Sequence, residues 1–232
     1  MNHCIAIITA RGGSKRIPRK NIKNFLGKPI LAYSISAALE SHCFDEVMVS
    51  TDDEEIAEVA RSNGATVPFF RSAKTSDDHS STNDVLLEVF EDYRKSGKKF
   101  QFACCLYPTA PFITGNKLRS GYEILLTTDA DATFPVTQFS YPIQRALKIE
   151  NGFLQMICPE NKFVRSQDLM PAYHDAGQFY WYRIEPFVQN KGVGYERSVP
   201  IIVPESEVQD IDTEEDWKIA EMKFQMLFKS GV

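Results

Sequence analysis

The chain has 232 residues, of which 43% are hydrophobic and 25% charged, and its formal net charge is −5. This composition is typical of a folded globular protein and excludes the disordered class. The negative charge argues against a nucleic-acid-binding surface. No apolar run approaches the roughly 20 residues that a membrane-spanning helix needs. We therefore expect neither a nucleic acid nor a membrane as a partner.

Strand and helix patterns alternate along the first half of the chain. Short apolar runs predict strands at residues 4–9, 45–51, 65–70, 130–137 and in the first part of 100–112. Amphipathic stretches with capping signals predict helices at residues 29–41, 52–64, 82–94 and 114–128. This order predicts an α/β fold: a three-layer open, mostly parallel, Rossmann-like sheet with helices on both faces.

The pattern weakens between residues 138 and 176, where short strand-like pieces alternate with polar turns. We interpret this segment as a small insertion within a single domain that spans residues 1–232. Strand character returns at 177–184 and at 198–204. A final helix with one apolar face is predicted over 213–230.

The five cysteines are odd in number and lack the spacing of a metal site or a redox motif. Cys4, Cys104 and Cys105 lie in apolar runs, which indicates buried free thiols. Free thiols persist in a reducing compartment, so we expect a cytoplasmic protein. The apolar stretch near the amino terminus is too short for a signal peptide and is interpreted as a buried strand.

A basic loop follows the first strand, with six cations and no acid between Arg11 and Lys23. Ligands usually bind at the carboxyl end of such a strand, and Gly12 and Gly13 let the backbone approach them closely. Arg11 offers forked donors and Lys15 a point charge, which together suit a di- or triphosphate. The alternative is a solvated basic loop, but glycines directly after a strand favour an anion site. The spacing fits neither a P-loop nor GxGxxG.

A pair of carboxylates, Asp210 and Asp212, precedes the final helix in the sequence VQDIDTEED. At the end of a predicted strand both would point the same way and could hold one hard cation such as Mg²⁺. The alternative is an acidic turn, in which Thr213 caps the helix and Asp216 serves its first turn. For an isolated pair, the acidic turn is the better interpretation.

The segment ARGGSKRIPRKN resembles the amino-terminal signature of the cytidylyltransferases that activate nonulosonic acids, the family of CMP-sialic acid synthetase. Further resemblance covers nearly the whole chain, in the segments GKPILAYSISAAL, VMVSTDDEEIAEVARSNGA, FRSAKTSDDHSST and YPTAPF. YPIQRAL and YHDAGQFYWYR most resemble the branch that acts on pseudaminic acid. The sialic acid branch normally has Gln at the position of Tyr107.

The resemblance implies that CTP and a nonulosonic acid give a CMP-sugar and pyrophosphate, with Mg²⁺ on Asp210 and Asp212. It implies three catalytic residues, Arg11, Lys15 and Asp212. The implied CTP-binding residues are Arg11, Gly12, Gly13, Lys15, Lys20, Asn21, Arg71 and Thr82. The implied sugar-binding residues are Tyr107, Arg165, Gln178 and Tyr180, with Arg145 a rival of Arg165. It also implies a homodimer that forms through residues 138–176. Arg16 is expected to point outward.

Other functions remain open at this point. The sugar could be sialic acid, legionaminic acid or the eight-carbon acid Kdo instead of pseudaminic acid. A protein of a different class, a nucleotide-binding module without turnover, would show the same basic loop. However, both acidic residues of the predicted metal site and all the cations of the loop are present. Nothing in the sequence therefore indicates an inactive site.

Overall fold

The central sheet of the computed structural model, which describes residues 3–77 and 80–228, is open and mostly parallel. Its strand order is β11-β6-β10-β5-β1-β4, and β9 also pairs with β6. The strands are β1 (Cys4–Thr9), β4 (Glu46–Ser50), β5 (Phe102–Leu106), β6 (Ala132–Gln138), β9 (Tyr173–Asp175), β10 (Phe179–Arg183) and β11 (Ser198–Ile202). Only β9 and β10 of these strands run against the rest. The predicted sheet is confirmed.

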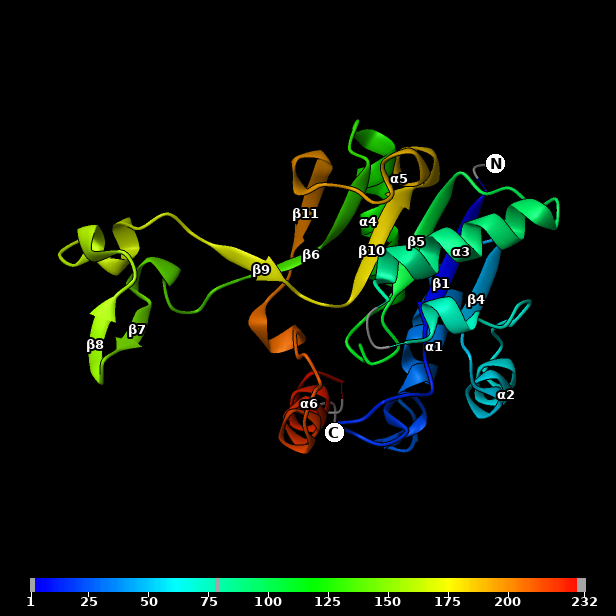
Figure 1. Ribbon diagram of the computed structural model, residues 1–232, viewed down its shortest axis with the longest axis horizontal. Coiled ribbons are helices and arrows are strands. Elements are labelled where there is room, and N and C mark those ends of the chain that lie inside the picture. The colour runs from blue at the N-terminus through cyan, green and yellow to red at the C-terminus, as the bar shows by residue number, and fades with distance from the viewer. Residues whose placement is uncertain (1–2, 78–79, 229–232) are drawn as a thin grey trace.

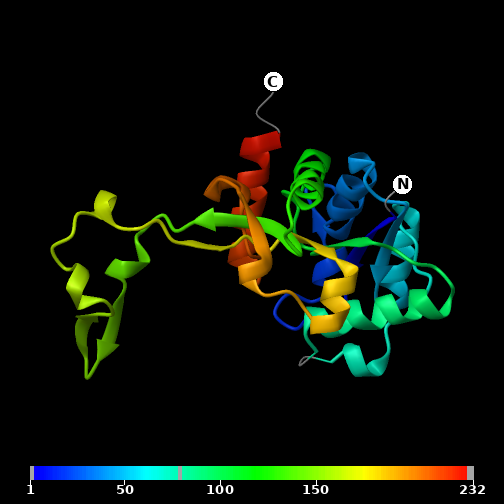
Figure 2. The same ribbon diagram turned by 90° about the horizontal axis from the view of Figure 1, so that it is seen from above.

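Helices cover both faces of this sheet (Figures 1 and 2). One face packs against α1 (Leu31–Ser41), α2 (Glu54–Ser62) and α4 (Gly115–Thr127), and the other against α3 (Thr82–Lys95) and α5 (Ile184–Asn190). Neighbouring residues of a strand face opposite sides, so Ile8 of β1 enters the first core and Ile7 the second. The predicted three-layer arrangement is confirmed.

The last helix, α6 (Glu214–Phe228), packs against the segment that follows β1. Its Trp217 meets Phe25 in the small hairpin of β2 (Asn24–Phe25) and β3 (Lys28–Pro29), with ring centroids 5.5 Å apart. Thr213 and Asp216 cap each other's backbone at the helix start, as predicted. The predicted end of this helix, 229–230, lies outside the described residues. This packing brings the segment before α6 beside the basic loop.

Residues 139–172 leave the sheet as an extended arm, between β6 and its partner β9 (Figures 1 and 2). The arm carries a hairpin of β7 (Leu147–Glu150) and β8 (Phe153–Met156), in which every residue is exposed except the half-buried Met156. Short 3₁₀ turns occur here and elsewhere: Lys20–Ile22, Ala73–Thr75, Ile143–Arg145, Pro159–Asn161, Ser166–Asp168, Tyr195–Arg197 and Glu205–Glu207. The arm stands apart from the alternating α/β pattern, and its role as an insertion of the family stays a prediction.

Three local predictions are wrong. No strand forms over 65–70: Thr66 makes a single parallel bridge with Met48, and Pro68 has no N–H to continue a ladder. The first helix begins at Leu31, because Pro29 belongs to β3. Asp210 and Asp212 follow an irregular stretch, since β11 ends at Ile202.

The cysteines are free, and Cys4, Cys104 and Cys105 are buried as predicted. Burial raises the pKa of Cys4 to about 11 and that of Cys105 to about 12, so both thiols stay neutral. Within residues 3–77 and 80–228, no helix has the length and apolar composition needed to cross a bilayer.

Candidate active site

A cavity of about 450 Å³ opens at the carboxyl end of β1. The basic loop forms one wall, and Thr82 at the start of α3 and Tyr107 after β5 form another. The predicted CTP-binding residues that line it are Arg11, Lys15, Lys20, Asn21 and Thr82. Residues from three separate segments therefore meet in one polar cavity that contains several cations.

The loop is held in shape by its neighbours. The Asn21 side chain is buried and donates from Nδ2 to the Arg11 carbonyl at 2.9 Å. The Gly12 N–H donates to Asp52 Oδ1, also at 2.9 Å. Asp52 follows β4, and the carboxyl ends of β1 and β4 meet because the two strands are parallel. Asp52 was not among the predicted site residues, although the acidic pair directly after β4 was an available signal.

A second anchor of the loop is Arg19, which takes a left-handed backbone conformation with φ of 57°. Its guanidinium donates to Asp53 at 2.5 and 2.9 Å and also pairs with Glu55. Asp53 in turn accepts from the Ile56 N–H and caps α2. The Arg19 guanidinium lowers the pKa of Asp53 from its ordinary value. Arg19 therefore fixes the loop to α2.

Replacing Gly12 with alanine should destabilise this anchor. A Cβ at Gly12 would lie 2.7 Å from Asp53 Oδ2, and Arg19 and Ile56 prevent Asp53 from moving away. We expect Gly12→Ala to lower the free energy of unfolding in urea by about 1–3 kcal/mol. Gly13→Ala is the matched control, because a Cβ there meets nothing within 4 Å. Equal unfolding free energies for the two variants would contradict this packing.

Arg71 does not line the cavity. Its guanidinium donates to the Ser50 carbonyl at 2.8 Å and to Ser50 Oγ at 3.2 Å, at the end of β4. Its backbone N–H donates to the Thr51 carbonyl. In this position Arg71 supports the segment that carries Asp52. A direct contact between Arg71 and a nucleotide stays a prediction.

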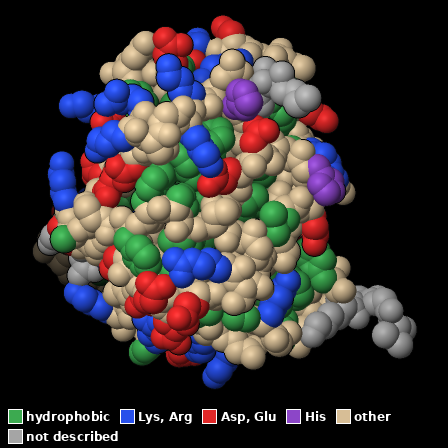
Figure 3. All heavy atoms as spheres, turned by 90° about the vertical axis from the view of Figure 1, so that its right-hand side faces the viewer, with side chains coloured by type: hydrophobic (Ala, Val, Ile, Leu, Met, Phe, Trp, Pro, Cys, Tyr) green, Lys and Arg blue, Asp and Glu red, His purple; other side chains and the backbone are tan. Residues whose placement is uncertain are grey.

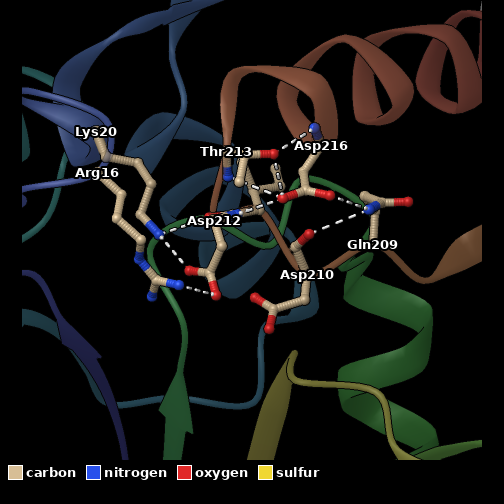
Figure 4. Close-up of polar contacts among 8 residues, drawn as sticks. Arg16, Lys20, Gln209, Asp210, Asp212, Thr213 and Asp216 are labelled. Atoms are coloured by element: carbon tan, nitrogen blue, oxygen red, sulfur yellow. Dashed lines mark hydrogen bonds and ion pairs between the residues drawn. The ribbon is translucent and has the colours of Figure 1, made fainter. Parts of the chain in front are cut away.

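Asp210 and Asp212 lie just before α6, and Asp212 faces Arg16 and Lys20, which line the cavity (Figure 4). Ile211 between them is buried, so both carboxylates face away from that core. Asp212 accepts from Arg16 Nη1 at 2.7 Å and lies 3.5 Å from Lys20 Nζ. Within the described part of the chain, no side chain bonds the Asp210 carboxylate. Two hard oxygen donors, one of them unoccupied by protein, fit a magnesium ion that takes its other ligands from phosphate and water.

The Arg16 side chain is exposed, as expected of an outward-pointing residue, but it also makes contacts that were not predicted. Its side chain lines the cavity and reaches Asp212, which is 196 residues away in the sequence. Lys20 makes the neighbouring contact and also donates to the Ile211 carbonyl at 2.6 Å. The packing of α6 on the loop after β1 creates both contacts, and no local pattern in the sequence could have revealed them.

A second cavity, of about 460 Å³, adjoins the first. Tyr107 lines both, and Asp210, Asp175 and Lys223 line the second. Tyr180 donates its hydroxyl to Asp175, with both oxygens at 2.9 Å. Burial, together with the negative charge of Asp175, raises the pKa of Tyr180, which keeps the hydroxyl protonated. The two cavities can therefore hold two ligands side by side.

The other predicted sugar-binding residues lie elsewhere. Gln178 is only 2% exposed, donates from Nε2 to the Glu207 carbonyl and lines neither cavity. Its contact with a sugar stays a prediction. Arg165 lies on the arm and pairs with Asp168 at 2.7 Å. Arg145, its rival, also lies on the arm and donates to the Val164 carbonyl. Neither arginine lines the cavities of its own chain.

The geometry agrees with the comparisons to known proteins. The family model described as Cytidylyltransferase matches residues 5–198, and the chain belongs to this family of nucleotidyltransferases. A pseudaminic acid cytidylyltransferase of Campylobacter jejuni (strain 81-176) is 42% identical over 228 residues, 98% of each chain. A CMP-N,N'-diacetyllegionaminic acid synthase of Legionella pneumophila is 32% identical over 94% of each chain.

A solved structure of CMP:2-keto-3-deoxy-manno-octonic acid synthetase, complexed with CTP, has the same fold. The TM-score is 0.69, with 97% of this chain and 99% of that chain covered, although the sequence identity is only 18%. At that identity the likeness shows the fold alone.

Proposed function

We propose that the chain transfers CMP from CTP to a nonulosonic acid, and that the acid is pseudaminic acid. The observation that carries this proposal is the pair of adjoining cavities that share Tyr107. One is lined by the cations of the basic loop and suits a triphosphate. The other is lined by polar and aromatic groups and suits a sugar. The relatives named pseudaminic acid cytidylyltransferase support the choice of sugar.

In the proposed reaction the anomeric hydroxyl of the sugar attacks the α-phosphorus of CTP. A bond forms between the sugar oxygen and the α-phosphorus. The bond from the α-phosphorus to the oxygen that bridges to the β-phosphorus breaks, pyrophosphate leaves, and the hydroxyl proton is released to solvent. Such a transfer depends on positioning and on charge neutralisation, with no covalent intermediate on the protein. Arg11, Lys15 and Lys20 hold the triphosphate, and Tyr107 lies between the two substrates. Asp210 and Asp212 would hold Mg²⁺, which when bound neutralises phosphate charge.

Pyrophosphate release tests this proposal. The protein, CTP and Mg²⁺ should release pyrophosphate when pseudaminic acid is added, and should release none without a sugar acid. Release without sugar would indicate hydrolysis of CTP and not transfer. The absence of release with pseudaminic, legionaminic and sialic acids alike would favour a nucleotide-binding module without turnover.

We also propose that a second copy of the chain covers the arm, in a cytosolic homodimer. Phe163 on the arm is 89% exposed, and Ile149, Phe153 and Leu154 of the hairpin are exposed as well. A two-stranded hairpin with bare apolar side chains is marginally stable by itself. The opposite face of the protein shows hydrophobic side chains interspersed with acidic and basic ones (Figure 3). If Arg165 binds the sugar, it does so in the active site of the partner.

Complementation tests the dimer and the place of Arg165 together. Arg165→Ala and Asp212→Asn variants should each be inactive alone, but co-expressed chains should regain about a quarter of the activity of the unmodified dimer, because half of the dimers are mixed and each has one intact site. Leu126→Asp, an exposed apolar site on α4, is a control that should leave the dimer intact in gel filtration. No regained activity in mixed dimers would show that Arg165 does not act across the interface.

A further inference from the structure

Arg16 forms an ion pair with Asp212, the carboxylate that we assign to the metal. Arg16 Nη1 donates to Asp212 Oδ2 at 2.7 Å, and Lys20 Nζ lies 3.5 Å from Oδ1 (Figure 4). Both oxygens of Asp212 therefore face cations of the protein when no ligand is bound. The backbone N–H of Asp212 donates to Asp216, which fixes this residue at the start of α6.

The two cations are held differently. The Lys20 side chain is 19% exposed and is anchored on the Ile211 carbonyl at 2.6 Å. The Arg16 side chain is 70% exposed and also lines the first cavity, beside Arg11 and Lys15. Arg16 can therefore turn from Asp212 toward the cavity without breaking a buried contact, whereas Lys20 cannot.

A divalent cation on Asp212 would lie within a few ångströms of the Arg16 guanidinium, and the two positive charges would repel each other. The triphosphate of CTP offers Arg16 a more highly charged anion in the adjoining cavity. Arrival of the nucleotide can therefore release Asp212 at the moment when a metal is required.

We propose that Arg16 is a positioning residue that holds Asp212 in the free protein and transfers to the triphosphate when CTP binds. Arg16 thus competes with the metal in the free protein and makes the binding of CTP and metal more cooperative. Nucleotide binding opens the metal site, which keeps a divalent cation from occupying it alone. This inference rests on the proposed function through the metal ligand Asp212.

The test uses Mn²⁺ as a probe, measured by electron paramagnetic resonance, with the full chain and no nucleotide. Arg16→Gln should bind Mn²⁺ at least about fivefold more tightly than the unmodified protein, because the competing cation is gone. In EDTA, calorimetry should show that the same variant binds CTP at least about fivefold more weakly. Arg16→Lys keeps the charge, so its affinities for Mn²⁺ and for CTP should both lie closer to those of the unmodified protein.

Lys23→Gln is the matched control. It removes one charge from the same loop, but Lys23 pairs with Glu214 and does not line the cavity. Its Mn²⁺ affinity should equal that of the unmodified protein. The inference is overturned if Arg16→Gln binds Mn²⁺ no more tightly than the unmodified protein, or if Lys23→Gln shows the same gain. Neither titration requires turnover, so a failure of the proposed reaction remains distinguishable by the pyrophosphate assay.

Discussion

Asp212→Asn should lower kcat by at least about a thousandfold, close to 4 kcal/mol of transition-state stabilisation. The substitution keeps the volume of the side chain and removes the charge that we assign to the metal. It also takes the counter-ion from Arg16 and Lys20, which contact this carboxylate at 2.7 and 3.5 Å. Initial rates at saturating CTP and Mg²⁺ would measure the loss.

Two controls separate the metal role from general damage. Asp210→Asn should also lower the rate, but less, since a water molecule can replace its link to the ion. Glu214→Gln removes an acid two residues from Asp212 that pairs with Lys23, and it should leave the rate near that of the unmodified protein. Asp212→Asn with most of its Mg²⁺-dependent activity intact would remove Asp212 from the metal site.

The fold was largely predictable because its elements carry local signals. The buried run Cys4–Thr9 shows an apolar pattern that needs no knowledge of its neighbours. The strand expected at 65–70 failed because Pro68 interrupts hydrogen bonding after a single bridge. The direction taken by residues 138–176 could not be predicted, since the exposed hairpin makes its strand contacts within itself.

The residues of the candidate site also differ in whether a local signal in the sequence predicts them. The cations of the loop were found because they adjoin two glycines and a strand. Contacts between distant segments were missed: Asp52 on Gly12 and Arg16 on Asp212 depend on the parallel pairing of β1 with β4 and on the packing of α6. The burial of Gln178 was not predicted, because strand alternation does not reveal that its side chain bonds the turn at Glu205–Glu207.

The preference for pseudaminic acid over sialic acid is the second large effect that we expect. The two acids share the carboxylate and the anomeric hydroxyl, so the reacting end cannot separate them. They differ in ring stereochemistry and in the far substituents, where pseudaminic acid has a methyl terminus and an added amide in place of hydroxyls. Near Tyr107, the Asp175 carboxylate is already bonded by Tyr180 and by the Gly177 N–H. A hydroxyl of sialic acid that is placed against the ring of Tyr107 would lose its hydrogen-bond partner.

Each buried hydroxyl without a partner costs about 1–3 kcal/mol, which corresponds to a ten- to hundredfold difference in kcat/KM. The most direct measurement is therefore kcat/KM for pseudaminic acid and for N-acetylneuraminic acid at one fixed CTP concentration, with the CMP-sugar identified by mass spectrometry. We predict that pseudaminic acid is preferred by at least about tenfold and gives CMP-pseudaminic acid with one pyrophosphate per turnover. Equal or better use of N-acetylneuraminic acid would contradict the proposed substrate.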